Sequence, residues 1–95
     1  MSIIKEKVPV TELLAGLAEE ASELAQAALK LRRVFDGTNP TPVKEDDAME
    51  RLYEEMADVK LYCVMLGVNP DYIIKMMQYK QKRWEERLSM CGQTK

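Results

Sequence analysis

The 95-residue sequence contains no histidine. A chain without histidine cannot build a Ser–His–Asp triad, a histidine–zinc site or the Glu-x-x-His element of di-iron carboxylate bundles. Any metal ion must therefore be held by oxygen ligands, and oxygen ligands favour magnesium, manganese or calcium over zinc. A metal-dependent chemistry of this chain would be that of a hard cation.

Cysteine, glycine and proline are also scarce. The two cysteines, Cys63 and Cys91, follow no metal-binding or redox spacing, and this predicts reduced thiols in the cytoplasm. Only four glycines and four prolines are present, and alanine, leucine, methionine, glutamate and lysine dominate, so the composition predicts helix. With 46% apolar and 32% charged residues, we expect residues 1–95 to form one folded domain.

The sequence has no long apolar run and no excess of positive charge. Its longest apolar stretch lies in Leu61–Val68 and is too short to span a membrane, and the first ten residues lack the apolar core of a signal peptide. The 14 basic and 16 acidic side chains leave a net charge of −2, which does not favour a nucleic-acid backbone. We therefore expect neither a membrane nor a nucleic-acid partner.

Apolar residues at three- and four-residue steps predict three helices. Thr11 and Asn69 are the expected N-caps of the first and third helices, and Gly37 and Gly67 are the expected stops of the first and second. Residues 1–10 and 91–95 are expected to form an extended N-terminal arm and a frayed tail. The helices are expected over 11–35, from a start between 41 and 46 to about 66, and over about 70–90.

The apolar stripes of the first two helices are predicted to centre on Leu17 and Leu52. The end of the second helix is different, because Leu61, Val64 and Met65 make it apolar nearly all round, and such a helix needs cover on every side. In so short a chain, a second copy is the expected cover. The predicted fold class is all-α, an antiparallel helical bundle of three main helices that is completed by oligomerisation. The predicted stripes are Leu14, Leu17, Ala21, Leu24, Ala28, Leu31 and Phe35, and Met49, Leu52, Met56, Val59, Cys63 and Leu66.

One acidic pattern occurs twice, in Leu17–Leu24 (LAEEASEL) and in Leu52–Val59 (LYEEMADV). At about 100° per residue, the second glutamate of each segment lies about 60° from the stripe centre and the following acid lies about 120° from it. If the two helices pack as an antiparallel hairpin, four carboxylates meet at a half-buried seam. These acids are Glu20 and Glu23 on the first helix, and Glu55 and Asp58 on the second.

Four neighbouring carboxylates repel one another and lose hydration, so the pattern predicts a compensating divalent cation. Mg²⁺ fits this ligand set and keeps positions open for water and substrate phosphates, and Mn²⁺ is a possible substitute. The simpler alternative is that these glutamates form a solvated helix surface. Glu19 lies near the far side of its helix, where solvent exposure is the better interpretation. The functional alternatives are an acid that supports the metal ligands from outside and a base for the attacking water.

The third helix carries a basic edge beside its apolar stripe. Lys80, Arg83 and Arg87 lie within about 120° of Met77 and are candidate phosphate contacts. The alternative is that they pair with acidic neighbours. Trp84 is a candidate for stacking on a base, and its alternative is core packing.

At Glu19–Glu23 (EEASE) and Glu55–Asp58 (EMAD) the sequence resembles the MazG-like all-α nucleoside triphosphate pyrophosphatases. The signature of that family is EExxE on one helix and ExxD on a later one. The resemblance covers about residues 11–90, including a looser likeness in the basic stretch Tyr79–Leu88, but only five residues carry the signature itself. The short chain is a departure from the family pattern, and we expect it to lack a second module that would contribute specificity.

The resemblance implies Mg²⁺-dependent hydrolysis of a nucleoside triphosphate between its α and β phosphates, in a homodimer or a dimer of dimers. Glu20, Glu23, Glu55 and Asp58 would be metal ligands, and Glu20 or Glu19 would accept the proton of the attacking water. Lys80 and Arg83 would contact phosphates. Two alternatives remain: a non-catalytic helical interaction or regulatory module that keeps an unused carboxylate site, and a nucleotide or metal sensor that binds without turnover.

Overall fold

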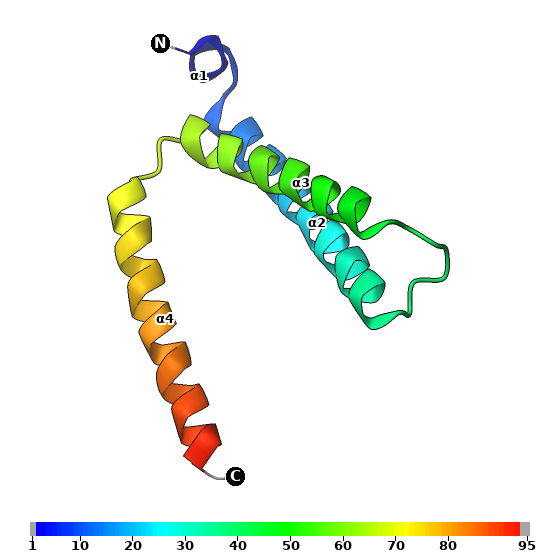
Figure 1. Ribbon diagram of the computed structural model, residues 1–95. Helices are drawn as coiled ribbons and strands as arrows, with labels where there is room; N and C mark the ends of the chain where they lie inside the picture. The colour runs from blue at the N-terminus through cyan, green and yellow to red at the C-terminus, as the bar shows by residue number, and fades with distance from the viewer. Residues whose placement is uncertain (1, 94–95) are drawn as a thin grey trace.

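The computed structural model describes residues 2–93 and contains four helices in that range (Figure 1). No strand occurs among these residues, so the all-α class predicted from the sequence is confirmed. Residues 1, 94 and 95, which include the end of the predicted tail, lie outside the described range. The helices are α1 (Ile3–Lys7), α2 (Val10–Asp36), α3 (Glu45–Met65) and α4 (Pro70–Gln93).

The helices α2 and α3 pack side by side as an antiparallel hairpin (Figure 1). Among the described residues, this pair makes the extensive helix–helix interface. The loop 37–44 joins them. Gly37 ends α2 in the left-handed conformation, with φ 76°, and donates its backbone N–H to the carbonyl of Arg33. Gly67 takes the same conformation after α3, with φ 73°. Both glycine stops predicted from the sequence are confirmed.

The N-terminal ends of the helices follow the prediction less closely. Asn69 caps α4 as expected, because its side-chain oxygen accepts hydrogen bonds from the backbone N–H groups of Asp71 and Tyr72. Thr11, in contrast, lies inside α2, whose N-cap is Pro9 without a side-chain hydrogen bond. The predicted arm is not extended throughout, because α1 forms a helical turn that Ser2 caps by accepting from the N–H of Ile4.

The third main helix, α4, does not join the hairpin within one chain (Figure 1). It projects from the end of α3, and every side chain described on it is exposed. The radius of gyration is consequently 17.5 Å, whereas a compact chain of this length has about 12 Å. A three-helix bundle therefore does not form inside the single chain, and its completion by a second copy remains a prediction.

The core of the hairpin is small and overlaps the predicted stripe of α2 only in part: Leu31 is buried as predicted, and Leu17 and Leu24 are half-buried. Leu13, Ala27 and Leu31 are buried on α2, and Ala48 is buried on α3. The accessible surface of 7970 Å² exceeds the roughly 5,600 Å² of a compact monomer of this mass. The predicted stripe was wrong at four positions because α4 leaves that side of α2 uncovered: Leu14, Ala21, Ala28 and Phe35 are exposed.

None of the helices in the described part of the chain combines the length and the apolar character that crossing a membrane requires.

Candidate metal centre

Each helix of the hairpin carries a glutamate at a position where a core residue is expected. Leu13, Glu20 and Ala27 follow one another at seven-residue steps on α2 and therefore lie on nearly the same face. Leu13 and Ala27 are buried, and Glu20 between them is half-buried. On α3, Ala48 and Glu55 are related by the same step, and both are buried. The two glutamates thus lie in the seam of the hairpin, not at its edge.

Three of the four predicted acids come together in this seam. One carboxylate oxygen each of Glu20, Glu55 and Asp58 lies within 4.8 Å of the other two. Glu20 comes from α2, and the other two come from successive turns of α3. Asp58 is exposed, so the group opens to solvent on one side. This spacing allows a single cation to contact all three carboxylates.

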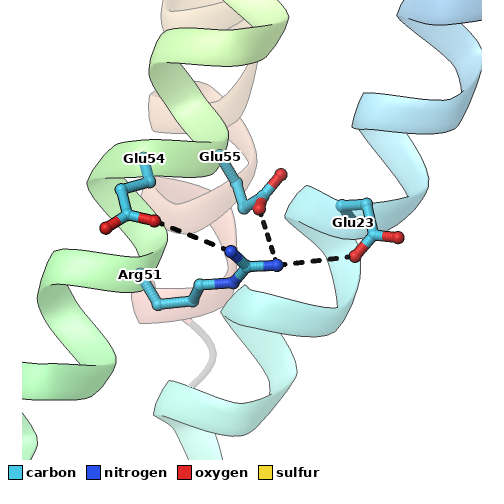
Figure 2. A network of polar contacts seen from close by, with 4 residues as sticks. All are labelled: Glu23, Arg51, Glu54 and Glu55. Carbon is cyan, nitrogen blue, oxygen red and sulfur yellow. Dashed lines mark ion pairs between the residues drawn. The ribbon is translucent and has the colours of Figure 1, made fainter.

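Glu55 is the most buried of these acids, with 3% of its surface exposed. Its Oε1 accepts from Nη2 of Arg51 at 2.9 Å, one turn earlier on α3. Its Oε2 is buried and has no hydrogen-bond partner among the described residues. Figure 2 shows this second oxygen turned away from Arg51. A buried carboxylate oxygen without a partner is costly, so this atom needs either a cation or, when Glu20 is protonated, the hydrogen bond of that side chain.

Glu23, the fourth predicted acid, is held by the same arginine. Its Oε2 lies 3.7 Å from Nη2 of Arg51, and Oε2 of Glu54 lies 3.6 Å from Nη1 (Figure 2). Glu23 is not part of the group of three. The motif analysis overlooked Arg51, although its position four residues before Glu55 is the spacing at which helical side chains pair.

The pKa of Glu20 is raised above its ordinary value. The largest cause is the loss of hydration in the seam, followed by the negative charge of Asp58 and by the hydrogen bond and charge of Glu55. Glu19 adds a smaller effect of the same sign and is itself exposed, as expected. The seam therefore resists a further negative charge, which is the electrostatic condition under which a cation binds.

A hollow adjoins the carboxylates on the side of the N-terminal segment. Glu20 and Asp58 line it together with Tyr62 and apolar side chains of the first 13 residues and the end of α3. Tyr62 is half-buried there and also lies against Gly16, where a side chain would overlap its ring. This hollow provides apolar surface directly beside the acidic group.

The predicted basic residues lie on α4 and, within one chain, do not reach the carboxylates. Lys80, Arg83, Trp84 and Arg87 are exposed on one surface of this helix, together with Met77 and Leu88. Trp84 is 63% exposed, so the core-packing alternative is not seen in the single chain. Arg83 lies over the ring of Tyr79 at 5.7 Å, and no described ion pair joins the three cations to an acid.

Comparison with known proteins gives no match: no family model fits the chain, and neither the curated proteins nor the solved structures show significant similarity to it.

Proposed function

We propose that this chain is a Mg²⁺-dependent nucleotide pyrophosphohydrolase of the MazG-like kind, which cleaves nucleoside triphosphates to the monophosphate and pyrophosphate. The observation that carries the proposal is the convergence of Glu20, Glu55 and Asp58 within 4.8 Å, with a buried oxygen of Glu55 left without a partner. A divalent cation satisfies that oxygen and relieves the repulsion among the three acids.

The donor set fits magnesium. All three groups are carboxylates, which hard cations prefer, and a site of three carboxylates leaves coordination positions for water and phosphate oxygens. Mn²⁺ accepts the same ligands and is the expected substitute. When bound, the cation supplies charge neutralisation for the phosphates and lowers the pKa of water.

The remaining roles are proposed for individual acidic residues of the hairpin. Glu55 and Asp58 anchor the cation from two turns of the same helix. Glu20, on the facing helix, is the third proposed ligand and the proposed acceptor of the proton from the attacking water. Glu19, exposed on the outer side of α2, is the alternative acceptor, and separate Gln variants distinguish the two.

Phosphate binding is assigned to Lys80 and Arg83, with Arg87 in support, from α4 of a second copy. Residues 10–66 contain twelve acidic and six basic side chains, whereas α4 contains three acidic and five basic ones, so the hairpin and α4 attract each other. The exposed apolar side chains of both parts give such an assembly a surface to bury. We therefore propose a homodimer or a dimer of dimers in the cytoplasm, with Trp84 positioned near the base.

The test is a panel of nucleoside triphosphates with Mg²⁺, in which pyrophosphate and orthophosphate are measured separately. We expect pyrophosphate and a monophosphate, and a loss of about 100-fold or more in Glu20→Gln and Glu55→Gln. Glu86→Gln, an exposed change on α4 of equal charge, serves as the matched control and retains the parent rate. If both Glu20→Gln and Glu55→Gln retain the parent rate, these two helices do not take part in the hydrolysis.

A non-catalytic helical interaction module is the second candidate, favoured by the uncovered surface of α4. It predicts Mg²⁺-dependent thermal stabilisation without hydrolysis of any nucleotide. A nucleotide sensor would bind a nucleotide tightly in calorimetry, and the nucleotide would be recovered unhydrolysed afterwards.

A further inference from the structure

The guanidinium of Arg51 divides the carboxylates of the seam into two groups. Glu23 and Glu54 lie on its side, at 3.7 and 3.6 Å. Glu20 and Asp58 lie in the other group and form no ion pair with any described lysine or arginine. Glu55 belongs to both, because Arg51 contacts only its Oε1 and leaves Oε2 without a partner.

The division separates a half of the seam that already contains a positively charged side chain from a half that contains none among the described residues. In the half around Arg51, the guanidinium lies 2.9, 3.6 and 3.7 Å from oxygens of three carboxylates (Figure 2). In the other half, neither Glu20 nor Asp58 has an ion-pair partner among the described residues, and the buried Oε2 of Glu55 has no hydrogen-bond partner there. A metal ion therefore gains most in the second half and meets a like charge in the first.

From this geometry we propose that Arg51 takes the place of a second divalent ion, so that the seam binds one Mg²⁺ or Mn²⁺ per chain through Glu20, Glu55 and Asp58. Glu23 then serves as a partner of Arg51 and not as a ligand of that ion. The proposal rests on the metal centre of the proposed function, but it adds the number of ions and the residue that sets it.

Two features oppose the displacement of Arg51. Its departure would leave Oε1 of Glu55 without its counter-ion, and the burial of Glu55 makes an unpaired charge there costly. The spacing of four residues on one helix also keeps the two side chains adjacent in any state where α3 is formed. The side chain of Arg51 is 53% exposed, so it rests on the seam from outside and can be exchanged for glutamine without opening a core cavity.

The experiment counts Mn²⁺ bound per chain by equilibrium dialysis, with the free ion measured by electron paramagnetic resonance. We expect one tightly bound ion in the parent and two in Arg51→Gln, where Glu23 and Oε1 of Glu55 are released for a second ion. The double variant Arg51→Gln/Glu23→Gln should return to one. Arg32→Gln, an exposed arginine of α2 outside the seam, is the charge-matched control and keeps one ion.

Each outcome is decisive. Two ions on the parent chain, or one on folded Arg51→Gln, would overturn the role of Arg51 while the metal centre stands. No bound ion on the parent would instead overturn the metal centre itself. If circular dichroism shows Arg51→Gln to be unfolded, the parent count still tests the proposal, and Arg51→Lys, which keeps the charge, is expected to bind one ion; two would contradict the proposal.

Discussion

Replacing Asp58 by asparagine should stabilise the metal-free protein, although the residue belongs to the proposed site. Asp58 is exposed and has no ion-pair partner among the described residues, so the substitution removes no favourable contact. It removes a negative charge that lies within 4.8 Å of an oxygen of the buried Glu55. The two side chains have similar shape and helix propensity, so electrostatic relief dominates.

The size of the effect follows from Coulomb's law. Two unit charges at that separation repel by about 0.9 kcal/mol with the dielectric constant of water and by about 3.5 kcal/mol with an effective value of 20. Asp58 faces solvent, so the lower figure applies, and we expect the variant to gain about 1 kcal/mol. For a domain of this size, that corresponds to a rise of about 4–8 °C in Tm.

The assay is thermal unfolding followed by circular dichroism, in EDTA and in saturating Mg²⁺, at one protein concentration. In the parent, Mg²⁺ at 100 times its Kd should add about 2.7 kcal/mol, and Asp58→Asn should lose most of that gain. Asp46→Asn on the same helix is the control with the opposite sign. Asp46 lies in the first turn of α3, where a negative charge stabilises the helix by about 0.3–1 kcal/mol.

The reasoning is refuted if Asp58→Asn lowers Tm in EDTA as Asp46→Asn does, because the seam carboxylates would then not repel one another. It is also refuted if Mg²⁺ stabilises Asp58→Asn as much as the parent, because Asp58 would then not be a ligand.

Three further predictions concern pH, assembly and packing. Because the pKa of Glu20 is raised in the folded state, the metal-free protein should lose stability as the pH rises from 4.5, the ordinary pKa, through the higher pKa of the folded state. Plots of Tm against pH for the parent and Glu20→Gln in EDTA should coincide below this pH range. Above it they should separate, with the variant more stable. Val64→Glu should lower the molar mass measured by light scattering toward that of a single chain, whereas Lys60→Glu on the same helix should leave it unchanged. Equal masses for the two variants would exclude the surface around Val64 from the subunit interface. Gly16→Ala should destabilise the protein by up to about 2 kcal/mol in chemical denaturation, because overlap with the ring of Tyr62 outweighs the better helix propensity, and an unchanged or raised stability would contradict that contact.

The candidate site was only partly readable from the sequence. The repeated acidic pattern identified Glu20, Glu55 and Asp58, because acids one helical turn apart project from the same side wherever the helix is placed. It did not show that Glu23 would pair with Arg51, because that contact depends on how the two helices are aligned along the seam. The seven-residue step from Leu13 through Glu20 to Ala27 was present in the sequence and would have placed Glu20 in the seam.

The sequence by itself determined the three long helices, although not the short α1. Their ends lie within a few residues of the predicted positions, because Gly37, Gly67 and the Asn69–Pro70 pair act through local backbone conformation and capping. Only the tertiary structure decided which face of α2 is buried, since its apolar residues cover two faces and the packing of α3 selects one. The sequence also did not determine the position of α4. An apolar pattern along a helix identifies the face that needs cover, but not the surface that covers it.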